Sequence, residues 1–388
     1  MSDFSSIIEF IKGIYRGQDF IALHEPKFRG NEKKYVLDAI ESTFVSSVGA
    51  YVNQFEEMIC KITGSSYAIA MVNGTNALHM ALLLADVEQN DEVLSQSLTF
   101  IATCNAISYI GAKPVFIDID KDTLGMSPES LSDFLKNRAE IRDDGFTYNK
   151  GTGKRIKACV PMHTFGLPCR IDEIMDICRE FNIALVEDAA ESLGSYYKEK
   201  HTGNFGLIGT FSFNGNKTIT CGGGGALITN DEIIAKRAKH LTTQAKVPHP
   251  WAFVHDEIGY NYRMPNLNAA LGCAQLEQLF DFVENKRQLS KLYSDFFSAN
   301  NLHYVNEIQG AKANYWLNAI LFNSLDERDR FLKLSNENGV MTRPAWELMH
   351  RLSMFSSAEK TDLTNSEWVV DRLINIPSSV RQHINSPV

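Results

Sequence analysis

The chain has 388 residues, of which 44% are hydrophobic and 22% are charged, and its formal net charge is −9. These values are ordinary for a globular protein with one large and one smaller domain, and the negative charge argues against a nucleic acid as the partner. No apolar run reaches the length of about 18 residues that a membrane span needs, and residues 1–16 make a poor signal peptide.

Seven cysteines are spread along the chain, an odd number without any Cys-x-x-Cys pair. This pattern argues against a disulfide framework and against a structural zinc site. We interpret all seven as small buried hydrophobic residues and expect a cytoplasmic protein without a metal.

The N-terminal part is expected to form a short helix over 7–15 and a connector, followed by apolar residues at helical spacing over 30–42 and 52–62. From residue 67 onward, strand-like runs alternate with helical patterns. The strands are expected over 67–72, 92–95, 114–119, 158–163, 183–187, 207–213 and 226–229, and the helices over 77–85, 99–110, 171–181 and 235–240. This alternation predicts an α/β fold with a mainly parallel sheet and helices on both faces.

The C-terminal part begins with a polar and aromatic segment, 242–261, which is expected to be a long functional loop. A single long helix is predicted over 265–283, followed by a mixture of strands and helices. We therefore expect three units: an N-terminal helix and connector (1–25), a large α/β domain (26–254) and a smaller α+β domain (255–388).

Polar residues follow several of the expected strands. Asn73, His163, Asp188 and Lys217 each lie just after an apolar run. Because the chemistry of open α/β sheets lies at the carboxyl ends of the strands, these residues are expected to meet at one edge of the sheet. A lysine there can carry its amine on a rigid element.

Two motifs carry a resemblance to a known family. One is the run 186–190, which contains Asp188, and the other is the run 211–213 with Lys217 and the four glycines 222–225. Over nearly its whole length the chain resembles the DegT/DnrJ/EryC1/StrS sugar aminotransferases, which are fold-type I enzymes that use pyridoxal phosphate. It looks closest to the branch that aminates C4 of a nucleotide-linked 4-keto-6-deoxy sugar, in legionaminic acid or bacillosamine biosynthesis.

The resemblance implies the two central roles. Lys217 would form a Schiff base with pyridoxal phosphate and later shuttle a proton. Asp188 would pair with the pyridine nitrogen and keep it protonated. Taken alone, Lys217 would read as a surface lysine in a turn and Asp188 as a helix-capping residue.

The resemblance also implies further contacts to the cofactor. Gly74 and Thr75, at a helix start, would cradle the phosphate, and Ser212 would reach it as well. Phe100 would stack on the ring; it could equally be a core aromatic residue. Glu191 stands where the family usually has a glutamine near the ring's 3′-oxygen, so a carboxylate there must be protonated or reoriented to help.

Four more residues are candidates for binding. Asn261 resembles the asparagine that a partner subunit lends to the phosphate, which implies a homodimer with shared active sites; the alternative is a loop asparagine. His163, Trp251 and Arg343 are candidate contacts of the sugar nucleotide, and His163 could instead be a structural histidine.

The implied reaction converts UDP-2-acetamido-2,6-dideoxy-4-keto-glucose to its 4-amino sugar, with L-glutamate as the donor. One alternative is a dehydratase or deoxygenase of the same family, in which histidine replaces the lysine; Lys217 stands against it. The other is a non-catalytic regulator that binds a sugar nucleotide.

Overall fold

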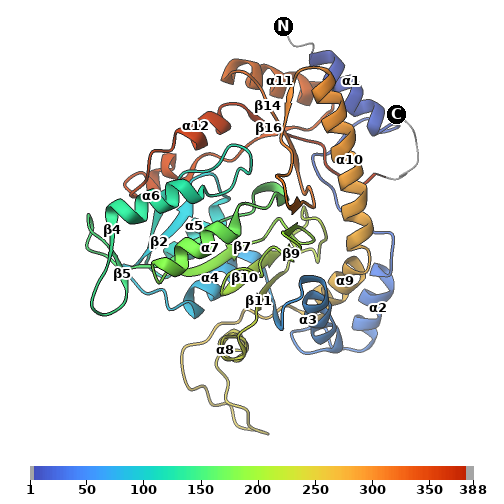
Figure 1. Ribbon diagram of the computed structural model, residues 1–388. Coiled ribbons are helices and arrows are strands. Elements are labelled where there is room, and N and C mark those ends of the chain that lie inside the picture. Colours follow the sequence, from blue (N-terminus) through green and yellow to red (C-terminus); the bar gives the residue numbers. More distant parts are fainter. Residues whose placement is uncertain (1–3, 382–388) are drawn as a thin grey trace.

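The computed structural model describes residues 4–381. Within these residues the main sheet has seven strands in the order β1-β11-β10-β7-β6-β2-β3 (Figure 1). Their bounds are β1 (Tyr67–Met71), β2 (Glu92–Gln96), β3 (Lys113–Ile117), β6 (Ile156–Val160), β7 (Ala184–Asp188), β10 (Ile208–Ser212) and β11 (Gly225–Thr229). The predicted α/β fold with a mainly parallel sheet is confirmed.

Only β11 runs against the others in this described sheet. It pairs antiparallel with both β1 and β10, whereas the pairings from β10 through β3 are parallel. The other six strands therefore share one direction, and their carboxyl ends lie along one edge. That edge is where the polar residues after the strands come together.

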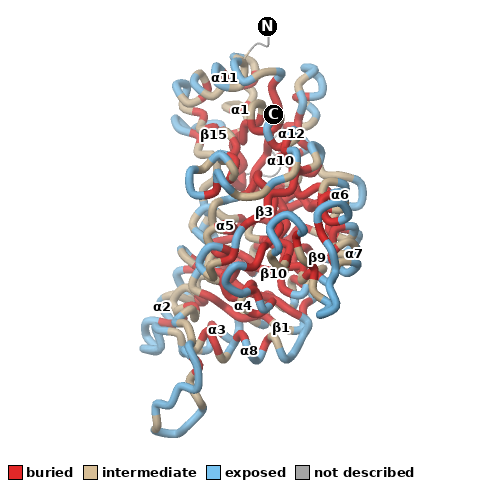
Figure 2. Tube along the Cα trace, turned by 90° about the vertical axis from the view of Figure 1, so that its left-hand side faces the viewer, coloured by how far each residue is buried: buried red, intermediate tan, exposed pale blue. Residues whose placement is uncertain are grey.

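Helices cover both faces of the sheet, and alternate residues of each strand point to opposite faces. On one face, Met71 and Leu227 pack with α4 (Gly74–Leu84), α5 (Ile101–Tyr109) and α8 (Glu232–Thr242). On the other face, the strands pack with α3 (Ala50–Thr63), α6 (Pro128–Arg138), α7 (Ile171–Glu180) and α9 (Asn266–Leu276). The strands of the sheet are almost wholly buried between these layers (Figure 2).

A second unit stands beside the carboxyl edge of the main sheet. Its antiparallel sheet has the order β12 (His303–Tyr304), β14 (Asn318–Leu321), β16 (Leu373–Ile376), β15 (Arg343–Pro344), and it packs with α10 (Leu279–Ala299), α11 (Leu325–Glu337) and α12 (Thr364–Val370). The first helix, α1 (Phe4–Ile14), packs here too, since Ile7 and Ile11 share a core with Tyr293 and Phe331. The domain bounds drawn from the sequence stay a prediction.

The long helix predicted over 265–283 is wrong, because the chain forms two helices that break at residues 277–278. Contacts with the segment around α2 (Glu32–Glu41) explain the break. Glu277 accepts hydrogen bonds from Asn31 and Tyr35, and the Gln278 side chain donates to Glu32. A tertiary contact of this kind leaves no mark in the local pattern of apolar residues.

Several short elements complete the described part. The strands β13 (Ala311–Lys312), β8 (Tyr196–Tyr197) and β9 (Lys200–His201) form one small sheet, and β4 (Ala139–Ile141) and β5 (Thr147–Asn149) form a hairpin between α6 and β6. Residues 243–261 form an arm that protrudes from the body (Figures 1 and 2), with its two legs bridged at Thr243–Asn261 and Lys246–His255. Among the described helices, none is long and apolar enough to cross a membrane.

Candidate active site

The carboxyl edge of the main sheet holds a cavity of about 210 Å³. The end of β7 and the turns that follow β1, β2 and β10 form its walls, together with Trp316 and Trp346 from the second unit. Most of the residues predicted for the site line it: Gly74, Thr75, Phe100, Asp188, Glu191, Ser212 and Lys217. Chain segments more than 100 residues apart are thus brought to one place.

Lys217 lies in the turn after β10, with its side chain 13% exposed. Its Nζ donates a hydrogen bond to Glu191 Oε1 at 3.1 Å and lies 4.0 Å from the centre of the Trp316 ring. The Trp316 indole N–H donates to the Asn216 carbonyl at 2.6 Å, which ties this ring to the lysine's own turn. The amine is therefore held between a carboxylate and an aromatic face at the wall of the cavity.

Glu191 follows β7 and is almost fully buried. Its second oxygen, Oε2, accepts a hydrogen bond from the Phe165 backbone N–H at 2.9 Å. Burial raises the pKa of Glu191 to about 7, although the Lys217 ammonium opposes this rise. The side chain is therefore poised between its neutral and its charged form near neutral pH.

Asp188 is the last residue of β7 and is also buried. Its Oδ2 accepts a hydrogen bond from the Thr103 hydroxyl at 2.6 Å, and its Oδ1 accepts one from the Ala190 N–H at 3.2 Å. Burial raises the pKa of Asp188, while these two hydrogen bonds and the charge of Lys217 act in the opposite direction. The carboxyl group is thus fixed in orientation at the floor of the cavity.

The helix α4 begins at the cavity. Asn73 caps it by accepting a hydrogen bond from the Asn76 N–H at 2.8 Å, and Gly74 and Thr75 form the first turn, where N–H groups have no acceptor within a helix. A Cβ on Gly74 would lie 2.8 Å from the Ser212 Cβ, so the helix start and β10 approach closely. This wall offers backbone donors, a hydroxyl and the positive end of a helix dipole to an anion.

Phe100 forms an aromatic wall and is 47% exposed. Its ring centre lies 6.0 Å from that of Trp346, which in turn lies 5.1 Å from Phe165. A ring held by aromatic neighbours on one side and open on the other can stack on a planar ligand.

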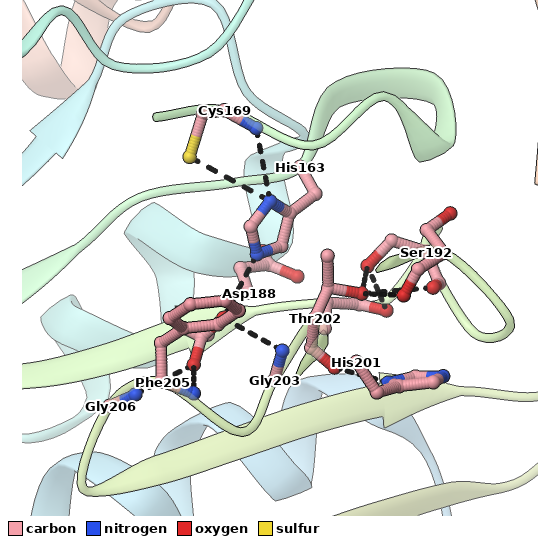
Figure 3. Close-up of polar contacts among 12 residues, drawn as sticks. His163, Cys169, Asp188, Ser192, His201, Thr202, Gly203, Phe205 and Gly206 are labelled. Carbon is pink, nitrogen blue, oxygen red and sulfur yellow. Dashed lines mark hydrogen bonds and ion pairs between the residues drawn. The ribbon is translucent and has the colours of Figure 1, made fainter. Parts of the chain in front are cut away.

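His163 does not line the cavity. It is buried behind the end of β7, where its Nε2 lies 3.0 Å from Glu187 Oε2 and its Nδ1 accepts from the Cys169 N–H (Figure 3). Burial works against its charged form, while Cys169 and Glu187 act in the opposite direction and raise the pKa of His163. Glu187 also accepts the N–H groups of Gly203, Phe205 and Gly206, so this cluster anchors the loop beneath Asp188.

The three other candidates are exposed and are not among the residues that line the cavity. Asn261 is at the base of the protruding arm, opposite Thr243, and Trp251 is 80% exposed at its far part. Arg343 contacts Asn336 and the Thr342 carbonyl in the second unit. Within this one chain, none of the three contributes to the cavity wall.

Two residues that were not predicted from the sequence contact the Asp188 carboxylate and the Lys217 amine. Thr103 donates to Asp188, and Trp316 covers the amine of Lys217. Thr103 lies in α5, and its hydroxyl lies 3.1 Å from that of Thr99, which precedes the helix. The two residues share no helix face, so helical spacing gave no signal for Thr103. Trp316 lies 99 positions beyond Lys217 in the chain, in the second unit, and no local pattern points to it.

Comparisons with known proteins identify the family of the chain. Residues 26–384 match the DegT/DnrJ/EryC1/StrS aminotransferase family. The GDP-perosamine synthase of Escherichia coli O157:H7 is 38% identical over 92% of this chain and 93% of its own length. EpsN of Bacillus subtilis (strain 168), provisionally described as a pyridoxal phosphate-dependent aminotransferase, is 38% identical over 87% of this chain and 84% of its own.

A similar solved structure is that of Helicobacter pylori PseC, an aminotransferase involved in pseudoaminic acid biosynthesis. It aligns with a TM-score of 0.84 over 95% of both chains, at 22% identity. At this level of identity the likeness concerns the fold alone, and it agrees with the architecture described above.

Proposed function

The chain belongs to the DegT/DnrJ/EryC1/StrS aminotransferase family, and on that premise we propose that it transfers an amino group to C4 of a nucleotide-linked 4-keto-6-deoxy sugar. Members of this family depend on pyridoxal phosphate. The protein is therefore a pyridoxal-phosphate-dependent sugar aminotransferase, and the proposal concerns its substrate and the roles of its residues.

The cavity has a partner for each functional group of this cofactor. Lys217 has an amine for the aldehyde, Asp188 a carboxylate for the pyridine nitrogen, and the first turn of α4 has N–H donors for the phosphate. When bound, pyridoxal phosphate withdraws electrons from the carbon that bears the amino group in transfer. The presence of Lys217 and Asp188 in one cavity is the observation that carries the proposal.

We assign the following roles to the chain's own residues. Lys217 Nζ moves the proton during the transfer, since it is the amine that reaches the cavity. Asp188 holds the ring nitrogen protonated, and Thr103 keeps the carboxylate in place. Ser212 and the start of α4 bind the phosphate, and Phe100 orients the ring.

For the substrate we propose UDP-2-acetamido-2,6-dideoxy-4-keto-glucose, with L-glutamate as the amino donor. The resemblance of the motifs to the legionaminic acid and bacillosamine branch supports this choice. A GDP-linked ketosugar is the second candidate, because the relative from Escherichia coli O157:H7, at 38% identity, is named a GDP-perosamine synthase.

A panel of UDP-, GDP- and dTDP-linked 4-keto-6-deoxy sugars tests the substrate, with glutamate as the donor and 2-oxoglutarate measured as the product. We expect the UDP sugar to have the highest kcat/KM. Turnover of the GDP sugar alone would favour the second candidate. The Lys217→Ala variant is the control and should form no product with any sugar.

We also propose that the active unit is a homodimer in which the partner supplies Asn261 to the phosphate. Asn261 is exposed and lies outside its own chain's cavity, yet it belongs to an arm that projects from the body. The arm carries exposed apolar side chains at Trp251, Phe253 and Ile258. Apolar surface of this kind supports docking onto a second copy.

A further inference from the structure

The charges in the cavity do not balance if every group is ionised. Among the described residues that line it, the ionisable side chains are Lys217, Glu191 and Asp188. Two buried carboxylates beside one ammonium leave an excess negative charge in a site of low dielectric, which is costly. This excess favours the uptake of a proton by one of the two acids near neutral pH.

Glu191 is the acid that is hydrogen-bonded to Lys217. The partners of Asp188 are the Thr103 hydroxyl and the Ala190 N–H, neither of which changes its charge. Glu191 Oε1, in contrast, accepts its hydrogen bond from the titratable Lys217 amine, at 3.1 Å. Burial holds the pKa of Glu191 at about 7 even beside that cation.

Lys217 needs an acceptor for a proton before it can act as a nucleophile or a base. Trp316 lies 4.0 Å from Nζ and favours the charged amine. In the described part of the chain, the hydrogen bond to Glu191 is the one that Nζ makes. Glu191 Oε1 is therefore the side-chain acceptor to which Nζ can transfer a proton directly.

We propose that Glu191 is the proton acceptor and store for Lys217. The N–H bond on Nζ breaks as an O–H bond forms on Oε1, so the pair passes from ammonium and carboxylate to free amine and carboxylic acid without a change in net charge. The inference rests on the cofactor chemistry of the proposed function, but it does not depend on which sugar is the substrate.

The surrounding charges agree with this assignment. Asp188, from the end of β7, faces Glu191 and favours its protonated form. His24, from the connector before α2, lies on the Lys217 side, and burial lowers the pKa of His24 well below its usual range, so it stays neutral. Lys286 of α10 donates to the Trp316 carbonyl at 3.1 Å, and burial lowers its pKa too.

The rate at which cofactor-free protein captures pyridoxal phosphate tests the proposal, because capture requires the free amine. The rate is followed by absorbance across a pH series that spans neutrality, in the wild type and in Glu191→Gln. In the wild type we expect it to level off above about pH 7, the pKa of Glu191. In Glu191→Gln we expect the rate to go on rising above that pH, because no carboxylate at position 191 accepts the proton from Nζ.

The ionisations of free pyridoxal phosphate in solution are the same in both experiments, so the difference between the profiles reports on Glu191. Asp176→Asn, at an exposed carboxylate on α7, is the matched control and should keep the wild-type profile. A levelling-off that persists in Glu191→Gln, or one that is already absent in the wild type, would overturn the proposal.

Discussion

Asp188 is buried, and the hydrogen bond from Thr103 holds its side chain in place. A substitution that removes only its charge is therefore a clean test of its role. We predict that Asp188→Asn keeps the fold but lowers kcat by roughly 10- to 100-fold. The reason is that a hydrogen bond to a charged group contributes about 1.5–3 kcal/mol and each 1.36 kcal/mol is about tenfold in rate. The same change at Asp176, which is exposed on α7, serves as the control, and unchanged turnover in Asp188→Asn would remove this residue from the mechanism.

Thr103 acts through Asp188, so it is a positioning residue. Thr103→Val removes the 2.6 Å hydrogen bond and should raise the pKa of Asp188 further, weakening the affinity for pyridoxal phosphate by about tenfold. Thr103→Ser keeps the hydroxyl and should restore the affinity. Equal cofactor affinity in the valine and serine variants would contradict this role.

At the residue scale, the strand ends predicted three of four groups correctly. Asn73, Asp188 and Lys217 line the cavity because strand ends of one direction meet at one edge, whereas His163 is buried behind β7 against Glu187. Gly74 and Ser212, which also line the cavity, were implied by the family resemblance and not by the strand ends. The roles assigned to them stay predictions. Trp316 could not be predicted, because its place depends on how a distant unit packs.

At the scale of the elements, Gly225 lets β11 start against the first turn of α4. A Cβ there would lie 2.4 Å from the Asn73 carbonyl, whereas one on Gly223 would meet nothing within 4 Å. We predict that Gly225→Ala lowers the free energy of unfolding by about 1–3 kcal/mol and that Gly223→Ala leaves it within about 0.5 kcal/mol. Urea denaturation of both variants checks this. Equal changes in the free energy of unfolding would show that the contact between Gly225 and the Asn73 carbonyl leaves room for a methyl group.

Most elements were predictable from periodicity, including the strands that end at the site. The strand predicted over 183–187 is β7 and the one over 207–213 is β10, because short apolar runs between turn signals mark buried strands. The break between α9 and α10 was not predictable, since the contacts of Glu277 and Gln278 with residues near α2 appear only in the folded chain.

At the scale of the whole molecule, subunit mixing tests the proposed shared site. Lys217→Ala and Asn261→Ala should each be almost inactive alone. If the partner supplies Asn261, unfolding and refolding the two together should restore roughly a quarter of the wild-type activity, because half of the dimers are hybrids with one intact site. No recovery in the mixture, with hybrids present, would place Asn261 in its own chain's site, whereas full activity of Asn261→Ala alone would place it outside any site.

The strand order of the main sheet also belongs to this scale. The sequence predicted a mainly parallel sheet but not that β11 lies reversed between β1 and β10. That reversal brings Gly225, the first residue of β11, to the start of α4, and Gly223 and Gly224 just before it line the cavity. It depends on which strands pair, and the apolar pattern of a single strand carries no such information.

The central claim is that the amine of Lys217 is the group that binds pyridoxal phosphate covalently. Lys217 and Asp188 line the same cavity. Borohydride reduction of the protein loaded with pyridoxal phosphate, followed by peptide mass analysis, tests it most directly. The account predicts that the reduced cofactor is found on the peptide that contains Lys217 and that Lys217→Ala carries none. Attachment to a different lysine, or none in the wild type, would contradict it.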